Sequence, residues 1–542
     1  MNKIIDKTRN FIFAKQTSIV SSAMILAVMI IVSRLFGFLR YRILSGYFTK
    51  EELDIFLASF RIPDLVFEIL ITGTLTSSFI PIFIKYQKER KQLDESVSSI
   101  INLIFLLMLG FVSVLFLTLD WLIPLITPGF EREKIVTIIY FSRILLIGQL
   151  PFLIIGNFLT GIGQANKTFL LSSVAPILYN LAIILSAVIL TPSMFLLAPI
   201  VGVVAGSILF FLIQLPLLKH SNFRYSMIIK KTEGLVEFTK IVIPRAFTVV
   251  VAQIDATIDL ILTTLLRAGS YTVFYFAQHL QLLPVSVLGM AYGQASLPYL
   301  SEVYHEKRIE EFQKIITDSI LNLFFFTIPI ASFFIFARTP LVRLFFGGEK
   351  FDWTATVETA VTLSFFSLSL PFHAVYYFLT RCFYAFLDTR TPFLISVFSI
   401  LLNTTISIIF VLLLHFPVWS LAFAFSLSIT LNVIILFLFL ARKFPKMDFK
   451  FLTVESAKMV LVTFISSVTT YYLMKLLDGL VFNTSFTVNV FLLLITGSIF
   501  FLGLYLFLSW FLDVKEMYLV TKIFLKMKEY QRKFVEFYSA YE

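Results

Sequence analysis

Apolar segments long enough to cross a lipid bilayer recur along the whole chain, and they constrain its fold more than any other feature. Hydrophobic residues make up 58% of the 542 positions and charged residues only 14%, whereas a soluble domain has about 25% charged residues. A helix needs about 20 apolar residues to cross the hydrocarbon layer, so the chain is predicted to be an all-α polytopic membrane protein with about fourteen transmembrane helices. The predicted spans are 17–38, 52–84, 97–119, 134–158, 169–190, 195–217, 238–265, 271–299, 315–338, 355–383, 392–414, 418–440, 452–476 and 487–511.

Basic residues collect in every second loop between these spans and set the predicted orientation. The basic loops contain Lys85, Lys88, Arg90 and Lys91, then Lys219, Arg224, Lys230, Lys231 and Lys240, then Lys307, Arg308 and Lys314, and finally Arg442, Lys443, Lys446 and Lys450. Cytoplasmic loops carry an excess of Lys and Arg, so both termini are predicted to be cytoplasmic. The same pattern assigns the net charge of +11 to topology and anionic lipid, and no nucleic acid partner is expected.

Matching residues in the two halves of the chain indicate an internal repeat. Pro151 and Phe158 in the first half recur with the same separation as Pro371 and Phe378 in the second. Two copies of about six spans each have the same orientation and are related by an axis along the membrane normal. The predicted domains are an N-lobe at 1–225, a C-lobe at 226–445, an added helix pair at 446–513 and a basic amphipathic cytoplasmic tail at 514–542.

The stretch from residue 33 to residue 81 is mostly apolar but carries charges at membrane depth. These charged residues include Arg34, Arg40, Asp54, Arg61 and Glu68. A charged side chain at the bilayer centre costs about 2.5–3.5 kcal/mol on insertion scales, so such residues usually face a bundle interior or a wet cavity. Either they line a polar, net cationic cavity, or Arg34 and Arg61 extend from the helix ends to the lipid headgroups. Guanidinium groups in a cavity favour an anionic, oxygen-rich ligand.

The corresponding part of the second lobe carries Arg245, Asp255, Asp259 and His279. Asp255 and Asp259 are four positions apart and therefore lie on one helical face. They either hold a cation or pair with an arginine such as Arg245. His279 either contacts an anion when protonated or is a hydrogen-bonded interior histidine.

The motifs of several enzyme classes are absent from the sequence. It has no G-x-x-x-x-G-K-[ST] loop for nucleotide phosphates, no H-E-x-x-H spacing among its histidines and no paired-aspartate motif for a Mg²⁺-dependent prenyl-phosphate enzyme. The single cysteine, Cys382, excludes a disulfide within the chain. The chain is therefore predicted to be a transporter and not an enzyme, with no cofactor.

Several strings along the chain carry a family signature. They are SRLFGFLR at 33–40, FRIP at 60–63, GTLTSSFIPIF at 73–83, LVRLFFGGEKFD at 341–352 and RCFYAFLDTRTPF at 381–393. These strings resemble the MurJ/MviN family, the lipid II flippases of bacterial peptidoglycan synthesis. The resemblance implies a MATE-like pair of lobes around a V-shaped cavity, with the helix pair at 446–513 forming a groove for the lipid tail. It also implies the bacterial cytoplasmic membrane as the location.

The resemblance implies a substrate-binding role for several cavity residues. The family's essential cavity arginines correspond to Arg34 and Arg40, and we add Arg61, Asp54 and His279 to the predicted substrate-binding set. Two departures from the family pattern affect this set. The arginine pair that usually follows the first lobe's x-P-[ND]-L string is Phe67-Glu68 here, and His279 stands in place of an arginine in YFAQHL. Arg61 is expected to compensate for the lost positive charge.

Three further positions, Asp259, Asp388 and Thr404, are similar to those of a proposed sodium site in the family. The resemblance therefore implies coupling of transport to a sodium gradient or to the membrane potential. The implied activity is movement of undecaprenyl-pyrophosphate-linked disaccharide-pentapeptide from the inner to the outer leaflet by alternating access. The implied partners are lipid II, membrane lipids and cell-wall synthesis proteins.

Other functions remain as alternative interpretations of the same sequence. In one alternative the chain exports another polyprenyl-linked oligosaccharide. In the other it is a transport-deficient membrane scaffold that recruits cell-wall machinery through its tail. A MATE-like antiporter of organic cations is disfavoured, because such a cavity needs acids and not arginines.

Overall fold

Helices joined by short loops make up the computed structural model, which describes residues 19–71, 78–221, 223–445 and 447–522. No strand occurs in these ranges, and eleven of the helices within them are long and apolar enough to cross a membrane. The predicted all-α polytopic class is thus confirmed, whereas the total of about fourteen spans stays a prediction.

Three of the predicted spans, 17–38, 52–84 and 238–265, are not among these eleven. The first two contain the charged stretch near the N-terminus. The first corresponds to α2 (Ile19–Tyr47), and the second is divided into α3 (Lys50–Ala58), α4 (Arg61–Leu70) and α5 (Ile80–Tyr86). A capping box begins α3, because Thr49 Oγ1 accepts from the Glu52 backbone while the Glu52 carboxylate accepts from the Thr49 backbone. The remaining span is α12 (Glu233–Thr264), which carries several charged residues.

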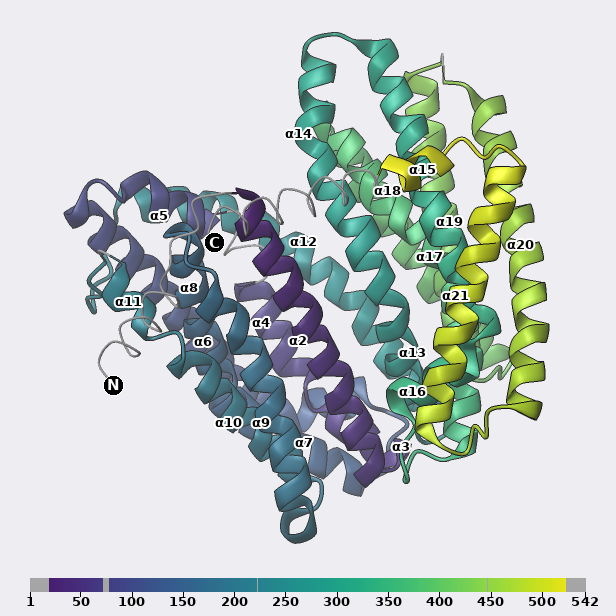
Figure 1. Cartoon of the computed structure of the whole chain (residues 1–542). Coiled ribbons are helices and arrows are strands. Elements are labelled where there is room, and N and C mark those ends of the chain that lie inside the picture. The colour runs from purple at the N-terminus through teal and green to yellow at the C-terminus, as the bar shows by residue number, and fades with distance from the viewer. Residues whose placement is uncertain (1–18, 72–77, 222, 446, 523–542) are drawn as a thin grey trace, which may run out of the picture. The chain divides into compact units, whose positions relative to one another are not determined.

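The chain divides into two compact units, of which the first comprises residues 1–273 and 345–355. Its other helices are α6 (Arg90–Ile126), α7 (Arg132–Gly148), α8 (Leu150–Ala165), α9 (Leu170–Met194), α10 (Leu197–Leu212) and α11 (Pro216–His220). The helix α9 packs against both α2 and α10, as Figure 1 shows for the purple and blue part of the chain. The helix α12 also packs against α4 and α6. It was predicted to begin the C-lobe, but it belongs to this first compact unit.

Small residues allow α9 and α10 to approach closely. A Cβ atom on Gly206 would lie 2.7 Å from the Tyr179 carbonyl oxygen, and one on Gly202 would lie 2.8 Å from Ile183 Cα. Helix pairs in membranes depend on such close backbone contact, because lipid tails and apolar side chains offer no hydrophobic driving force between helices.

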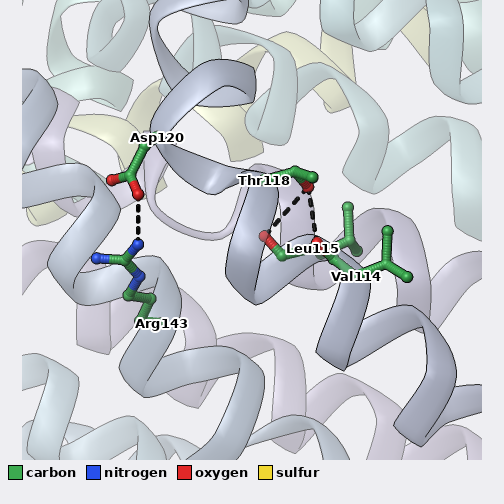
Figure 2. A network of polar contacts seen from close by, with 5 residues as sticks. All are labelled: Val114, Leu115, Thr118, Asp120 and Arg143. Carbon is green, nitrogen blue, oxygen red and sulfur yellow. Dashed lines mark hydrogen bonds and ion pairs between the residues drawn. The ribbon is translucent and has the colours of Figure 1, made fainter.

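An ion pair neutralises two charges within the apolar helices α6 and α7. Arg143 Nη2 donates to Asp120 Oδ2 at 2.7 Å (Figure 2). The guanidinium also lies 5.1 Å from the centre of the Phe116 ring. In the same region Thr118 Oγ1 donates to the Val114 carbonyl at 2.9 Å, so its hydroxyl is satisfied within its own helix. Asp120, Arg143 and Thr118 thus each have a hydrogen-bond partner within these helices.

The second compact unit comprises residues 274–344 and 356–542. Its helices are α13 (Ser270–Pro284), the π-helix η2 (Val285–Met290), α14 (Ala291–His305), α15 (Ile309–Phe336), α16 (Arg338–Phe346), α17 (Trp353–Ala385), α18 (Arg390–Ile408), the π-helix η3 (Ile409–Leu413), α19 (Trp419–Lys443), α20 (Phe449–Leu480) and α21 (Thr487–Phe511). One apolar core unites α14, α15, α17 and α19, with Phe312 and Phe378 fully buried at its centre.

The helix pair α20 and α21 packs against α15 of this unit. Tyr505 is buried in α21 and donates to the Phe325 carbonyl at 2.8 Å. Beside it lies an apolar cavity of about 370 Å³, lined from α15 and α21 mainly by phenylalanine, leucine and isoleucine. The division into predicted lobes and an added pair stays a prediction, since the compact units instead part at Val273.

Replacing Gly206 by alanine is expected to lower the thermal unfolding midpoint of the detergent-purified protein, because the new Cβ would force α9 and α10 apart. The matched control is Gly503→Ala in α21, where nothing lies within 4 Å of the added atom. The control is expected to keep or raise the midpoint, because alanine favours a helix over glycine by about 0.5–1 kcal/mol. Equal midpoints for the two variants would contradict close packing at Gly206.

Candidate functional site

Charged residues of α2, α4 and α12 gather within the first compact unit, and Arg61 is at the centre of the group. Its Nη2 donates to the Gln253 carbonyl at 2.6 Å and to the Gln253 side-chain oxygen at 2.8 Å. Its Nε and Nη2 donate to Thr257 Oγ1 at 3.1 Å and 2.9 Å. These bonds hold one edge of the half-buried guanidinium against α12.

Carboxylates surround this guanidinium. Asp64, one turn after Arg61 in α4, is exposed and lies within electrostatic reach of Arg61, Glu68 and Arg40. On α12, the buried Asp259 interacts with the neighbouring charge of Asp255 and with Arg61. The group therefore contains two arginines and four acids, so it is mixed in charge and is not a purely cationic patch.

Arg40 enters the group from α2, but Arg34 does not accompany it. The Arg40 guanidinium lies 4.4 Å from the centre of the Tyr41 ring and acts electrostatically on both Asp64 and Tyr179. Arg34 is exposed and lies six residues earlier, which corresponds to about 9 Å along the axis and a rotation of about 120°. Arg40 and Arg61 are therefore brought together by the fold, whereas Arg34 lies on another face of α2.

This arrangement suits an anionic ligand that is accompanied by a cation. Two guanidinium groups near an exposed carboxylate give an accessible polar surface, and arginine binds phosphate and carboxylate oxygens through a planar fork of donors. The nearby acids add negative charge to the same surface. However, no group of three or more His, Cys, Asp or Glu side chains within the described ranges has the geometry to hold a metal ion.

Asp54 has a structural position in this unit. Its carboxylate accepts hydrogen bonds from the backbone of Gly269 at 2.7 Å and from the backbone and hydroxyl of Thr272, each at 2.8 Å. Gly269 and Thr272 flank the first residues of α13, where backbone N–H groups have no partner within the helix. Asp54 is fully buried and acts as the N-terminal cap of α13, so its acceptors are occupied without substrate.

His279 lies in the second compact unit, on α13. Its Nδ1 is 3.0 Å from the Tyr275 carbonyl, and its ring stacks on the Tyr275 ring with centroids 4.0 Å apart. The ring is half-buried. His279 was interpreted either as an anion contact or as a hydrogen-bonded interior histidine. Its contacts are those of the second kind.

Two residues of the predicted sodium site, Asp388 and Thr404, lie far apart in the second compact unit. Asp388 precedes α18, where its carboxylate accepts from the Arg390 and Thr391 backbones at 3.1 Å and 3.0 Å and from Thr391 Oγ1 at 2.8 Å. Thr404 lies on the same helix near its other end, roughly 21 Å from Arg390 at the rise of an α-helix. Asp388 and Thr404 therefore cannot coordinate one ion, and Asp388 instead caps α18.

Comparison with known proteins identifies the family. A sequence profile described as "Lipid II flippase MurJ" matches residues 44–492. The chain belongs to the MurJ family. The "Probable lipid II flippase MurJ" of Rickettsia prowazekii is 26% identical over 72% of this chain and 77% of that protein.

Solved structures of the MurJ family and of related transporters share the fold. The structure described as "Lipid II flippase MurJ, inward closed conformation" has a TM-score of 0.73 and 24% identity, covering 90% of this chain and 98% of that chain. An inward-facing multidrug resistance MATE family transporter of the MOP superfamily has a TM-score of 0.64 and 14% identity, covering 79% and 98%. The resemblance to MurJ and the MATE-like fold class are thereby confirmed.

Two residues of the site in this MurJ family member were not singled out in the sequence. Gln253 and Thr257 supply every acceptor that Arg61 uses in α12. They are four positions apart and so share a helical face, next to the acids at 255 and 259. Polar residues with this spacing inside an apolar helix are a signal that could have identified them.

Replacement of Asp54 by alanine is expected to destabilise the protein by about 1–3 kcal/mol, because the backbone N–H groups of Gly269 and Thr272 lose their acceptor. The conservative variant Asp54→Asn keeps one oxygen and should lose less. Thermal unfolding of the purified protein measures both effects. A midpoint unchanged by alanine would show that Asp54 does not cap the helix.

Asp388 is expected to contribute pH-dependent stability. Partial desolvation acts to raise its pKa, but hydrogen bonds from Thr391 and Arg390 outweigh this effect and lower the pKa below the ordinary value. A lowered pKa means that the stabilisation is present above about pH 4 and is lost as the pH falls through the pKa of the folded state. Asp388→Asn should therefore unfold at a slightly lower temperature than the parent at pH 7, with the difference shrinking towards pH 3. A difference that does not depend on pH would exclude this role for the charge.

Proposed function

We propose that this protein is a lipid II flippase, which moves the undecaprenyl-pyrophosphate-linked peptidoglycan precursor across the bacterial cytoplasmic membrane. The observation that carries this proposal is the match of the MurJ family profile to residues 44–492. The fold supports it, since TM-scores of 0.73 and 0.64 relate the chain to a MurJ structure and to a MATE transporter. A transporter function also agrees with the helical membrane architecture.

Arg40 and Arg61 are the proposed contacts for the pyrophosphate. Transfer of a charged group into hydrocarbon is prohibitive without partners, so the site must supply donors to replace water. Arg61 uses Nε and Nη2 towards α12, which leaves the Nη1 edge as the one directed to a ligand. Arg34 is exposed on another face of α2 and is proposed as a contact during substrate entry, before the headgroup reaches Arg40.

The acids next to Arg61 are the proposed link to the driving force. Asp255 and Asp259 are two acids on one face of α12, where we propose that a proton or a sodium ion binds. Cation binding would release Arg61 from their attraction and strengthen its interaction with phosphate. We therefore place sodium or membrane-potential coupling at Asp255 and Asp259, and not at Asp388 or Thr404.

The proposed location is the bacterial cytoplasmic membrane with both termini in the cytoplasm. The support is the distribution of Lys and Arg among alternate loops. In this orientation α2 ends at the outer side of the membrane at Tyr47. The prenyl chain is proposed to stay in lipid along α20 and α21, and the basic tail is proposed to meet cell-wall synthesis proteins.

A second candidate function is export of another polyprenyl-linked oligosaccharide. It is favoured by Phe67-Glu68 and His279, which replace arginines expected in the cavity. Reconstitution in vesicles separates the two candidates, since fluorescent lipid II and an undecaprenyl-pyrophosphate oligosaccharide without the pentapeptide can be offered in competition. Preferred transport of the second compound would replace the lipid II assignment.

In the same vesicles, Arg40→Ala is expected to reduce outward movement of lipid II by about tenfold or more, because a charge-assisted hydrogen bond contributes about 1.5–3 kcal/mol. Arg40→Lys should retain part of the rate, and Arg40→Glu should be the most damaging. Arg442→Ala in an exposed position serves as the matched control. Full activity of Arg40→Glu would rule out contact between Arg40 and the pyrophosphate.

A further inference from the structure

The segment 345–355 is an unusual part of the chain, because it belongs to the first compact unit while the residues on both sides belong to the second. We call it the strap. It contains the FFGGEKFD string, whose role the proposed transport site does not explain. The strap runs from the last two residues of α16 to the first three residues of α17 and contacts the C-terminal half of α2.

Three kinds of contact dock the strap on α2. The backbone N–H of Phe351 donates to the Ser45 carbonyl at 3.1 Å. Ser45 is in the last turn of α2, where carbonyl groups have no partner within the helix, so the strap satisfies one of them. This bond caps the end of the helix that carries Arg40.

Aromatic rings supply the second contact. Phe345 packs on Phe38 with centroids 4.8 Å apart, and Phe346 packs on Phe38 and Tyr41 at 6.2 Å and 6.4 Å. Phe346 is fully buried and Phe351 nearly so. The docked state therefore removes substantial apolar surface from its surroundings, with aromatic pairs contributing about 0.5–1.5 kcal/mol each beyond that burial.

The fit of Gly348 supplies the third contact. A Cβ atom at this position would overlap the peptide group that joins Ser45 to Gly46. The backbone of the strap thus lies directly on the backbone of α2, and only glycine permits this approach.

The strap is also connected to the proposed substrate site. Phe346 packs on Tyr41, and the Arg40 guanidinium lies over that same Tyr41 ring at 4.4 Å. Asp352 within the strap accepts from the Ala355 backbone at 2.7 Å and so begins α17. One short segment therefore joins the end of α2, the surroundings of Arg40 and the start of a helix that continues into the other unit.

We propose that the strap is a latch, which is docked on α2 in one state of the transport cycle and must leave it for the cycle to proceed. The physical reason is the chain connection, because any change in the placement of the two units must strain the ends of the strap at 344–345 and 355–356 or detach it. The contact is non-covalent, so it can break, and the fit of Gly348 on the α2 backbone makes it specific. This inference rests on the proposed flippase function.

The test uses reversible cross-linking of the full-length protein in vesicles. Gly46→Cys and Lys350→Cys place thiols on α2 and on the strap, where Gly46 has open space and Lys350 is exposed. The native Cys382 is buried, so it does not compete for a bifunctional methanethiosulfonate reagent. The linked protein is expected to lose at least tenfold in lipid II transport and to recover it after reduction, while lipid II binding stays within twofold.

Failure of the latch and failure of the proposed flippase function give different results in this experiment. Failure of the pair to cross-link, or undiminished transport by the linked protein, would overturn the latch. Each single-cysteine variant treated with the same reagent must retain transport, so that the loss is assigned to the link. Absence of lipid II binding and transport in the untreated protein would instead overturn the proposed function, whatever the cross-linking yield.

A second variant tests the docking itself. Gly348→Val in the double-cysteine background should reduce the cross-linking yield at least fivefold, because the added side chain overlaps the α2 backbone. Glu349→Val, at the adjacent exposed position, is the matched control and should leave the yield unchanged. Equal yields for the two variants would contradict the docked geometry.

Discussion

A charge inside an apolar helix bundle persists only where the bundle supplies a partner, and this constraint governs the polar part of the structure. Arg143 meets this requirement with Asp120, and Arg61 meets it with the amide and hydroxyl groups of α12. The two solutions differ in consequence. The pair at Arg143 has no net charge, because one carboxylate balances one guanidinium. Arg61 is held by uncharged acceptors, so its positive charge remains available to a ligand and to the acids around it.

The sequence determines the fold more directly than it determines the site. Length and apolar character suffice to predict the helices, because crossing hydrocarbon requires a continuous run of apolar residues. Residues 52–84 were predicted as one span, whereas their described part contains the separate helices α3, α4 and α5. The site was harder to predict, because the residues that decide it are far apart in the chain. Asp54 was predicted to bind substrate, whereas its carboxylate accepts hydrogen bonds from Gly269 and Thr272, more than 200 positions away in the chain.

Two of the signature loops can be explained by local hydrogen bonding. In DTRTP, Asp388 accepts from Arg390 and Thr391 and begins α18, while in FFGGEKFD, Asp352 accepts from the Ala355 backbone and begins α17. An acidic residue in such a string thus has a sufficient structural reason to be present. This is why similarity to a motif could not by itself distinguish an ion ligand from a helix cap, and why the distance along α18 was needed to separate Asp388 from Thr404.

The mixed charge of the Arg61 group gives a physical basis for coupling ligand and cation. If the four acids and two arginines were all ionised, the acids would attract the guanidinium groups and oppose an incoming pyrophosphate. In the proposed cycle, neutralisation of Asp255 or Asp259 by a cation would reverse this balance without moving Arg61, because Gln253 and Thr257 hold its position through uncharged groups. Under this proposal the fixed guanidinium would change its effective affinity through its neighbours alone. Anion binding and cation binding would then favour each other, as reciprocal linkage between two ligands requires.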